Sequence, residues 1–292
     1  MTGNKTNGNG NGHAGEMKNA LLGGIMNMVL IIFSFTCIFP LIWMFYSSLK
    51  LRREFNADII SLPKAPTFSN YIDIATNPNT QIWQAMFNSL RATVLSILFL
   101  ILFSFVIGYI LARIKFPGNR AIYYMLLAGM LIPIHSLMVP VYVIFSDFGL
   151  TNKWFTLLIP YVSFALPLGV FLVQGFVKSL PTALEEAAAI DGSSFTRTLF
   201  QIIFPICMPI LATVAIIQTF GFWNEFPFAL ILISDVRLQT VPRALRQLTG
   251  TFSSDNPKIM AAVLLTMSPI IVYYFVFSKN IIKGMVTGAV KG

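Results

Sequence analysis

Long uncharged runs alternate with polar connections along the whole chain. Six runs lack Asp, Glu, Lys and Arg, and each has the roughly 20 residues that an α-helix needs to cross about 30 Å of hydrocarbon. A charge in mid-bilayer costs about 2.5–3.5 kcal/mol, so such clean runs indicate transmembrane helices. The predicted spans cover residues 25–46, 92–112, 121–146, 154–177, 198–224 and 259–278.

Composition excludes an ordinary soluble protein. Charged residues make up 11% of the 292-residue chain and hydrophobic residues 56%, whereas a soluble domain carries roughly 25% charged residues. The runs show no alternation of polar and apolar positions, which excludes a membrane β-barrel. We therefore predict an all-α integral membrane protein with six transmembrane helices. Residues 1–19, rich in Gly and Asn, are expected to form a disordered tail, and residues 20–292 the membrane domain.

Several of the runs contain proline. Transmembrane helices accept proline where neighbouring groups satisfy the freed carbonyls, and the result is often a kink. We expect kinked helices, either around a pathway or for packing alone. The prolines concerned are Pro40, Pro133, Pro140, Pro160, Pro167, Pro205 and Pro209.

Charges between the runs bear on topology. The net charge of +9 comes from Lys and Arg scattered in short groups, which is typical of membrane-flanking residues and not of a nucleic-acid-binding patch. Of the two shortest loops, one has Arg113, Lys115 and Arg120, and the other has Lys153 alone. Because Lys and Arg collect on the cytoplasmic side, both termini, and with them the predicted tail, are expected in the cytoplasm.

The connection between the fourth and fifth runs, residues 181–205, has the most informative sequence. Thr182 and Glu185 have the spacing of a capping box, which predicts the start of a helix. Asp191-Gly192 predicts its end, and either serine of the pair that follows can cap a second helix. A short helix of small residues suits docking into a groove of a partner protein. The alternative is an ordinary amphipathic loop.

The residues of this connection resemble the EAA loop of permeases of ATP-binding-cassette importers. They are Glu186-Ala187-Ala188, Gly192, Ile202 and Pro205, with Phe204 where leucine is usual. Further residues narrow the resemblance to the carbohydrate-uptake branch, in the second permease subunit of maltose-type transporters. In chain order these are Ser48-Leu49-Lys50, Asn70-Tyr71, Asn88-Ser89, Pro133, Pro140, Asp191, Trp223-Asn224 and Gly288-Ala289-Val290-Lys291-Gly292.

The resemblance implies roles for particular residues. The helix from Thr182 to Ile190 would be a cytoplasmic coupling helix seated in a cleft of an ATPase subunit, where Glu186 would meet a basic group. The loop of residues 234–258 would reach an extracellular solute-binding protein. The coupling residues would be Glu185, Glu186, Ala187, Ala188, Asp191, Gly192 and Pro205, and the tail residues that contact the ATPases would be Lys283, Lys291 and Gly292.

The resemblance also implies an assembly. The chain would work with a sister permease, two ATP-binding-cassette ATPase subunits and the solute-binding protein, in the cytoplasmic membrane of a prokaryote. The sequence lacks a Gly-x-x-x-x-Gly-Lys-Ser/Thr phosphate loop, so we do not expect an enzyme. ATP and Mg would belong to the partner ATPase, and no cofactor, metal or nucleic acid is expected on this chain.

Four residues are candidates for the solute path: His135, Trp223, Asn224 and Glu225. Alternatively, His135 is a packed polar residue bonded to a neighbouring helix, and Glu225 is a carboxylate at headgroup level. The predicted function is import of a sugar or oligosaccharide. The alternatives are the same type of importer for a non-sugar solute, or a stand-alone carrier or channel. The lack of Asp and Glu at mid-depth of the spans argues against a secondary carrier.

Overall fold

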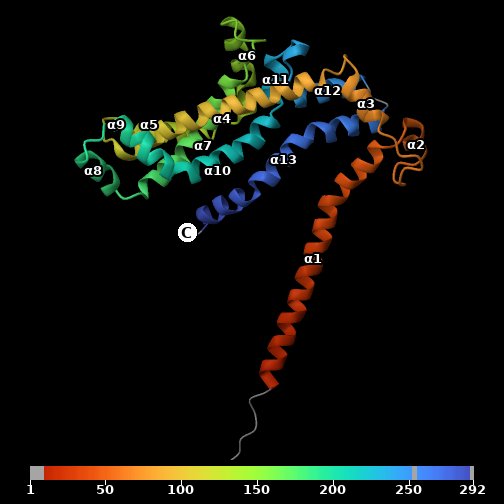
Figure 1. The fold of residues 1–292 in the computed structure, drawn as a ribbon, viewed down its shortest axis with the longest axis horizontal. Helices are drawn as coiled ribbons and strands as arrows, with labels where there is room; N and C mark the ends of the chain where they lie inside the picture. The colour runs from red at the N-terminus through yellow and green to blue at the C-terminus, as the bar shows by residue number, and fades with distance from the viewer. Residues whose placement is uncertain (1–9, 252–254, 290–292) are drawn as a thin grey trace, which may run out of the picture. The chain divides into compact units, whose positions relative to one another are not determined.

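The computed structural model describes residues 10–251 and 255–289, whose regular secondary structure is entirely helical (Figure 1). The all-α class predicted from the sequence is thus confirmed. The chain divides into two compact units. The first comprises Met1–Asn70 with Asp255–Ala261, and the second Tyr71–Ser254 with Ala262–Gly292. Two helices, α3 (Ser69–Thr76) and α13 (Asn256–Ala289), belong partly to each unit.

The first unit contains the first predicted span. α1 is Gly10–Ser48 and α2 is Arg52–Ala57. The helix begins at Gly10 and thus includes residues 10–19 of the expected tail, whereas residues 1–9 lie outside the described part. Adding a turn to an existing helix requires no new nucleation, which is why a stretch without apolar periodicity can still be helical.

Polar side chains fix the chain after α1. Lys50 is fully buried, and its Nζ donates to the carbonyl of Asp58 at 2.9 Å. The side-chain amide of Asn70 donates to the carbonyls of Ser48 and Lys50 at 2.8 and 2.9 Å. Buried polar groups require such partners. These bonds give a structural reason for two of the residue groups that carried the family resemblance.

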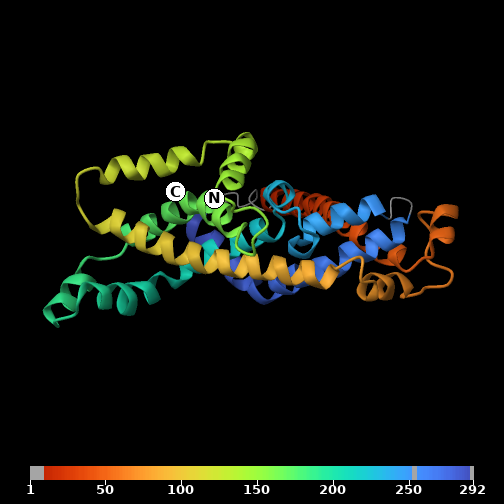
Figure 2. The same cartoon turned by 90° about the horizontal axis from the view of Figure 1, so that it is seen from above.

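The second unit is built on three helices that pack together: α4 (Ile82–Arg113), α7 (Leu158–Lys178) and α10 (Phe204–Trp223) (Figures 1 and 2). Small residues bring α4 and α7 close. A Cβ built at Gly108 would lie 2.8 Å from Cγ1 of Val173. Membrane helices use such small residues because close backbone approach replaces the hydrophobic driving force.

The third predicted span, residues 121–146, is not one straight helix. It consists of α5 (Asn119–Gly129), the 3-10 turn η1 (Ile134–Leu137) and α6 (Met138–Asp147), and the segments Asn119–Gly129 and Ile134–Asp147 are bent by 95° relative to each other. Pro133 lies at the break with φ of −63°. A proline disfavours the helical conformation of the residue before it, so the helix stops ahead of Pro133.

The other predicted spans are continuous helices. Within the described residues, five helices are long and apolar enough to cross a membrane, and the bent pair makes a sixth candidate if its two parts form one span. Most of them extend a few residues beyond the uncharged runs. The five are Leu21–Ser48, Ile82–Arg113, Leu158–Lys178, Phe195–Trp223 and Asn256–Phe277.

Short helices fill the connections. Between α7 and α10 lie α8 (Ala183–Ile190), α9 (Phe195–Arg197) and the π-helix η2 (Thr198–Ile203). Between α10 and α13 lie α11 (Pro227–Leu232), η3 (Val236–Leu238) and α12 (Val241–Thr251).

α12 and α8 mark the two ends of α4. α12 is amphipathic: Val241, Ala244 and Leu248 are buried and Arg246 is exposed, as expected for a helix with one apolar face. α12 packs on α4. Near the start of α4, the side-chain amide of Asn88 donates to the carbonyl of Gln239. The last residue of α4, Arg113, instead bonds to Glu185 of α8.

Candidate functional site

α8 starts differently from the prediction. Among the described residues, no backbone amide is capped by the side chain of Thr182, which has helical angles. Glu185 does not turn back to Thr182 either, because its Oε1 accepts a hydrogen bond from Nε of Arg113 at 2.7 Å. The predicted capping box is therefore wrong. A guanidinium competes successfully for the carboxylate, since charge-assisted bonds are the stronger ones.

The end of α8 agrees with the prediction. Gly192 has φ of +75°. Its amide donates to the carbonyl of Ala189 at 3.1 Å, and the amide of Ser193 donates to the carbonyl of Ala188 at 2.9 Å. This is the bonding pattern of a Schellman motif, in which the residue after the cap takes the left-handed conformation that glycine adopts without strain.

The second helix starts as predicted, at a serine cap. Oγ of Ser194 accepts a hydrogen bond from the amide of Arg197 at 3.4 Å. The hydroxyl of Thr198 donates to Oγ of Ser193 at 3.0 Å. The two serines thus tie the turn after Gly192 to the first residues of the next helix.

α8 has two distinct faces. Ala188 is 5% exposed, and Leu184 packs against the buried cluster that includes Phe105 and Leu199. Glu185 belongs to this inner face through Arg113. The outer face carries the remaining residues, all exposed: Ala183, Glu186, Ala187, Ala189, Ile190 and Asp191.

The outer face combines small residues with one large apolar side chain. Ile190 is 86% exposed, more than any other large hydrophobic side chain in the described residues. Glu186 and Asp191 place carboxylates beside it. The exposed isoleucine and the alanines beside it form a shallow, partly apolar surface on this face of α8.

Pro205 lies just beyond η2, near the start of α10, and is exposed. Phe204, which replaces the usual leucine, packs edge-to-face on Phe105 of α4 with ring centroids 4.9 Å apart. This pair joins the start of α10 to the core beneath α8. Phe204 thus makes an apolar contact at the position where leucine is usual.

The candidate solute-path residues differ in location and in exposure. Trp223 is 5% exposed and lines a cavity of about 270 Å³ between α4, α10 and α13. His135 lies in η1 and is exposed. Asn224 follows α10, and its side-chain amide donates to the carbonyl of Phe220 at 2.9 Å. The cavity is lined by Leu90, Thr93, Val94, Ile97, Leu98, Ala215, Thr219, Trp223, Pro269, Ile270 and Tyr273.

Glu225 has a structural function in the described residues. Its carboxylate accepts hydrogen bonds from the amide of Phe228 at 2.6 Å and that of Ala229 at 3.2 Å, so it holds the first turn of α11. The hydroxyl of Tyr161 donates to the same carboxylate at 3.0 Å, which connects α7 with α11. A role of Glu225 in the solute path remains a prediction.

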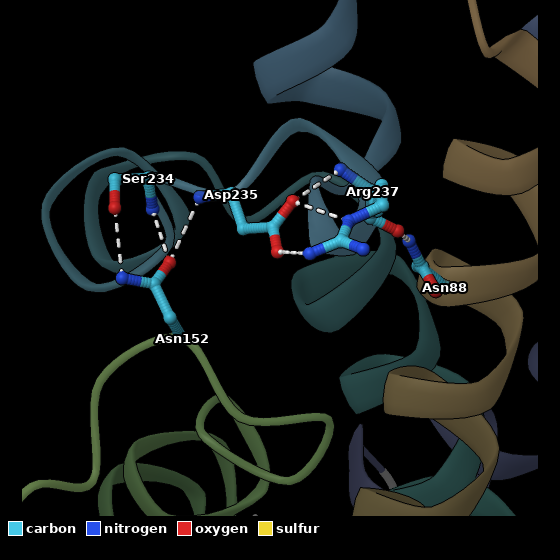
Figure 3. A network of polar contacts seen from close by, with 5 residues as sticks. All are labelled: Asn88, Asn152, Ser234, Asp235 and Arg237. Atoms are coloured by element: carbon cyan, nitrogen blue, oxygen red, sulfur yellow. Dashed lines mark hydrogen bonds and ion pairs between the residues drawn. The ribbon is translucent and has the colours of Figure 1, made fainter.

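Sequence reasoning missed a polar network at the end of α4 opposite α8 (Figure 3). Oδ1 of Asn152 accepts hydrogen bonds from the amides of Ser234 and Asp235 at 2.6 and 2.9 Å, and its Nδ2 donates to Oγ of Ser234 at 2.7 Å. Asn88 donates to the carbonyl of Arg237 at 2.9 Å. A signal was present in Asn88-Ser89, which the family resemblance had already singled out.

Arg237 is a bonded member of this network. Its side chain forms an ion pair with Asp235 at 2.8 Å, and the Arg237 guanidinium and amide hold the pKa of the Asp235 carboxyl below its ordinary value. Arg243 donates to the carbonyl of Leu230 at 2.9 Å. Both arginines are thus used within the chain.

The C-terminal candidates are only partly described. Lys283 lies in the described helix α13, and Lys291 and Gly292 lie outside the described residues. Within the described part of the chain, no group of three or more His, Cys, Asp or Glu side chains is placed to hold a metal ion.

Comparisons with known proteins add to this picture. The family described as "Binding-protein-dependent transport system inner membrane component" matches residues 104–287. The chain is 35% identical, over 88% of its length and 85% of the relative's, to the diacetylchitobiose uptake system permease protein NgcG of Streptomyces coelicolor. It is 34% identical, over 86% of its length and 91% of the relative's, to the multiple sugar-binding transport system permease protein MsmG of Streptococcus mutans.

The fold has a counterpart among solved structures. It is similar to a chain of a bacterial ABC transporter involved in the import of the acidic polysaccharide alginate, with a TM-score of 0.79. The similarity covers 90% of this chain and 97% of that chain at 21% sequence identity.

Proposed function

The chain belongs to the family of binding-protein-dependent transport system inner membrane components, and on this basis we propose that it is a permease subunit of an ATP-driven importer for a sugar or oligosaccharide. The two relatives described above are permeases of uptake systems for diacetylchitobiose and for multiple sugars. Both match over most of their length, which supports the same role for this chain.

The outer face of α8 carries the proposal. Ile190 is 86% exposed, and the acidic Glu186 stands beside it on a helix whose other face is packed. We propose that α8 is the coupling helix and that it sits in a cleft of an ATPase subunit, with Glu186 opposite a basic group. The turn at Asp191-Gly192 and the helix start at Pro205 would hold it in place.

The proposed mechanism is mechanical. Closure of two ATPase subunits on ATP would move the coupling helices of this chain and of a sister permease, and the pair would rock between inward- and outward-facing states. ATP and Mg would be bound by the ATPases, and this chain would itself catalyse no reaction. Residues Lys283, Lys291 and Gly292 would add a contact between the C-terminal tail and the ATPases.

Topology follows from the position of α8. If α8 meets the ATPase, then the end of α4 with Arg113 is cytoplasmic, in agreement with the cations Arg113, Lys115 and Arg120. The loop of residues 234–258 is then external and available to a solute-binding protein. Both termini would be cytoplasmic, and the membrane would be the prokaryotic cytoplasmic membrane. His135, Trp223, Asn224 and Glu225 stay as proposed solute-path residues.

Reconstitution tests the function directly. The chain is co-expressed with its sister permease, ATPase and binding protein, purified, and placed in liposomes with labelled di- to tetrasaccharides outside. We expect uptake only with internal ATP and the binding protein. Uptake by the chain alone, without ATPase, would contradict the proposal and favour a carrier or channel. If the complex took up a non-sugar ligand with ATP but no saccharide, the proposal of an ATP-driven importer would stand and the proposal of a sugar substrate would be wrong.

A further inference from the structure

We infer that Arg113 is a positioning residue that fastens the coupling helix to α4, and that Glu185 acts inside this chain and does not contact the ATPase. The inference rests on the proposed function of α8. It assigns different roles to the two neighbouring glutamates: Glu185 anchors α8 to α4, and Glu186 faces the ATPase subunit.

The guanidinium of Arg113 makes two bonds at once. Nε donates to Oε1 of Glu185 at 2.7 Å, and Nη2 donates to the carbonyl of Leu180 at 2.8 Å. Leu180 belongs to the short connection between α7 and α8. One side chain at the end of α4 therefore holds both the connection before α8 and its first turn, which suits the rigid, several-donor geometry of arginine and not that of lysine.

The pair lies in a sheltered place. The side chains of Arg113 and Glu185 are 15% and 18% exposed. Oε2 of Glu185 is buried and accepts no hydrogen bond from the described residues, so Arg113 is the cation on which this carboxylate depends. Removing one member leaves the other charge poorly compensated, which is costly in a partly buried site.

A second contact with α4 holds the far side of the turn. The ring of Tyr109, one helical turn before Arg113, lies 6.0 Å from the ring of Phe195 in α9. α8 is thus flanked by two attachments to the same helix, one before it and one after Gly192. A push on the outer face of α8 is then transmitted to α4 and not absorbed by bending of the loop.

The test separates attachment from docking. Arg113→Gln and Glu185→Gln remove the charge on each side, and the double variant Arg113→Glu with Glu185→Arg restores the pair in reverse. Lys115→Gln is the matched control, since this nearby cation is exposed. Each is purified as the full importer, and sugar transported per ATP hydrolysed is measured in liposomes.

We expect both single variants to bind the ATPase and hydrolyse ATP, with a fall in sugar per ATP of roughly tenfold, within the range of ordinary coupling energies. The reversed pair should recover much of this ratio, and Lys115→Gln should match the unchanged protein. An unchanged ratio in Arg113→Gln overturns the inference alone. Failure of the unchanged importer to couple ATP to uptake overturns the proposed function.

A distance measurement keeps the inference testable apart from transport. Spin labels are placed at Lys115 and Ala187, both exposed, in the otherwise unchanged chain and in Arg113→Gln. The single narrow distance distribution expected in the first should broaden in the second. Equal widths would contradict the anchor whatever the solute or partner proves to be.

Discussion

Gly169 of α7 lies directly against Ser104 of α4: a Cβ built at Gly169 would stand 2.8 Å from Cβ of Ser104. Real Cβ atoms do not approach so closely, so Gly169→Ala must push the two helices apart. We expect a loss of about 1–3 kcal/mol in stability, typical of overpacking. Thermal unfolding of the purified protein in detergent measures it.

The same helix offers the control. A Cβ at Gly175 would meet no atom of the described chain within 4 Å. Gly175→Ala should leave the unfolding temperature unchanged or raise it slightly, because alanine is the better helix former by up to about 1 kcal/mol. If both variants behaved alike, the contact with Ser104 would not be the cause.

At Gly192 the obstacle to substitution is the backbone and not space. Its φ is +75°, and a Cβ there would meet no atom of the described chain within 4 Å. Gly192→Val should therefore cost about 1–2 kcal/mol locally and sharply reduce ATP-driven uptake. Gly192→Asn should keep most of the uptake, since asparagine tolerates the left-handed conformation. Equal loss in both variants would point to a contact of Gly192 with the partner.

Glu186 is exposed, and reversing its charge should break docking and leave the fold intact. We expect the Glu186→Lys variant to insert into the membrane, with a free energy of unfolding within about 0.5 kcal/mol of that of the unchanged protein. It should nevertheless lose ATPase binding and uptake. A pull-down with tagged ATPase measures this. Lys115→Glu, also an exposed reversal, should still bind. Normal uptake by Glu186→Lys would remove Glu186 from the interface.

Asn152 combines a positive φ of +54° with three side-chain bonds to Ser234 and Asp235. Asn152→Gly keeps the backbone conformation but loses the bonds, worth about 1–3 kcal/mol. Asn152→Ala loses the bonds and adds backbone strain, so it should be the less stable of the two. Hydrogen exchange at the amides of Ser234 and Asp235 should quicken in both, and unchanged exchange would show that these bonds do not hold the loop.

The spans and the end of α8 could be predicted because both depend on local sequence. Clean uncharged runs locate helices in hydrocarbon regardless of what they pack against. Gly192 follows Asp191 at a point where only the nearest residues decide the conformation. For the same reason the prediction that Ser193 or Ser194 caps the second helix is confirmed, and Ser194 is the cap.

What failed depends on residues far apart in the chain. The capping box at Thr182 was wrong because Arg113, distant in sequence, bonds to Glu185. The kink expected at Pro133 is confirmed, but its size of 95° could not be predicted, because an apolar run does not reveal how far the chain will bend at a proline. The Asn152 network could not be predicted, because the residues that bond to Asn152 lie 82 and 83 positions away in the sequence. Local periodicity does not indicate such a contact.

The 95° bend between Asn119–Gly129 and Ile134–Asp147 restricts what can surround it. The amides of Met130, Leu131 and Ile132 bond to carbonyls three residues back, so the regular helical pattern is interrupted at Pro133. An acyl chain offers no hydrogen bond to a backbone group that such an interruption leaves without a partner. If the bent pair is one membrane span, water or another polypeptide, and not a phospholipid tail, must cover the corner at Pro133.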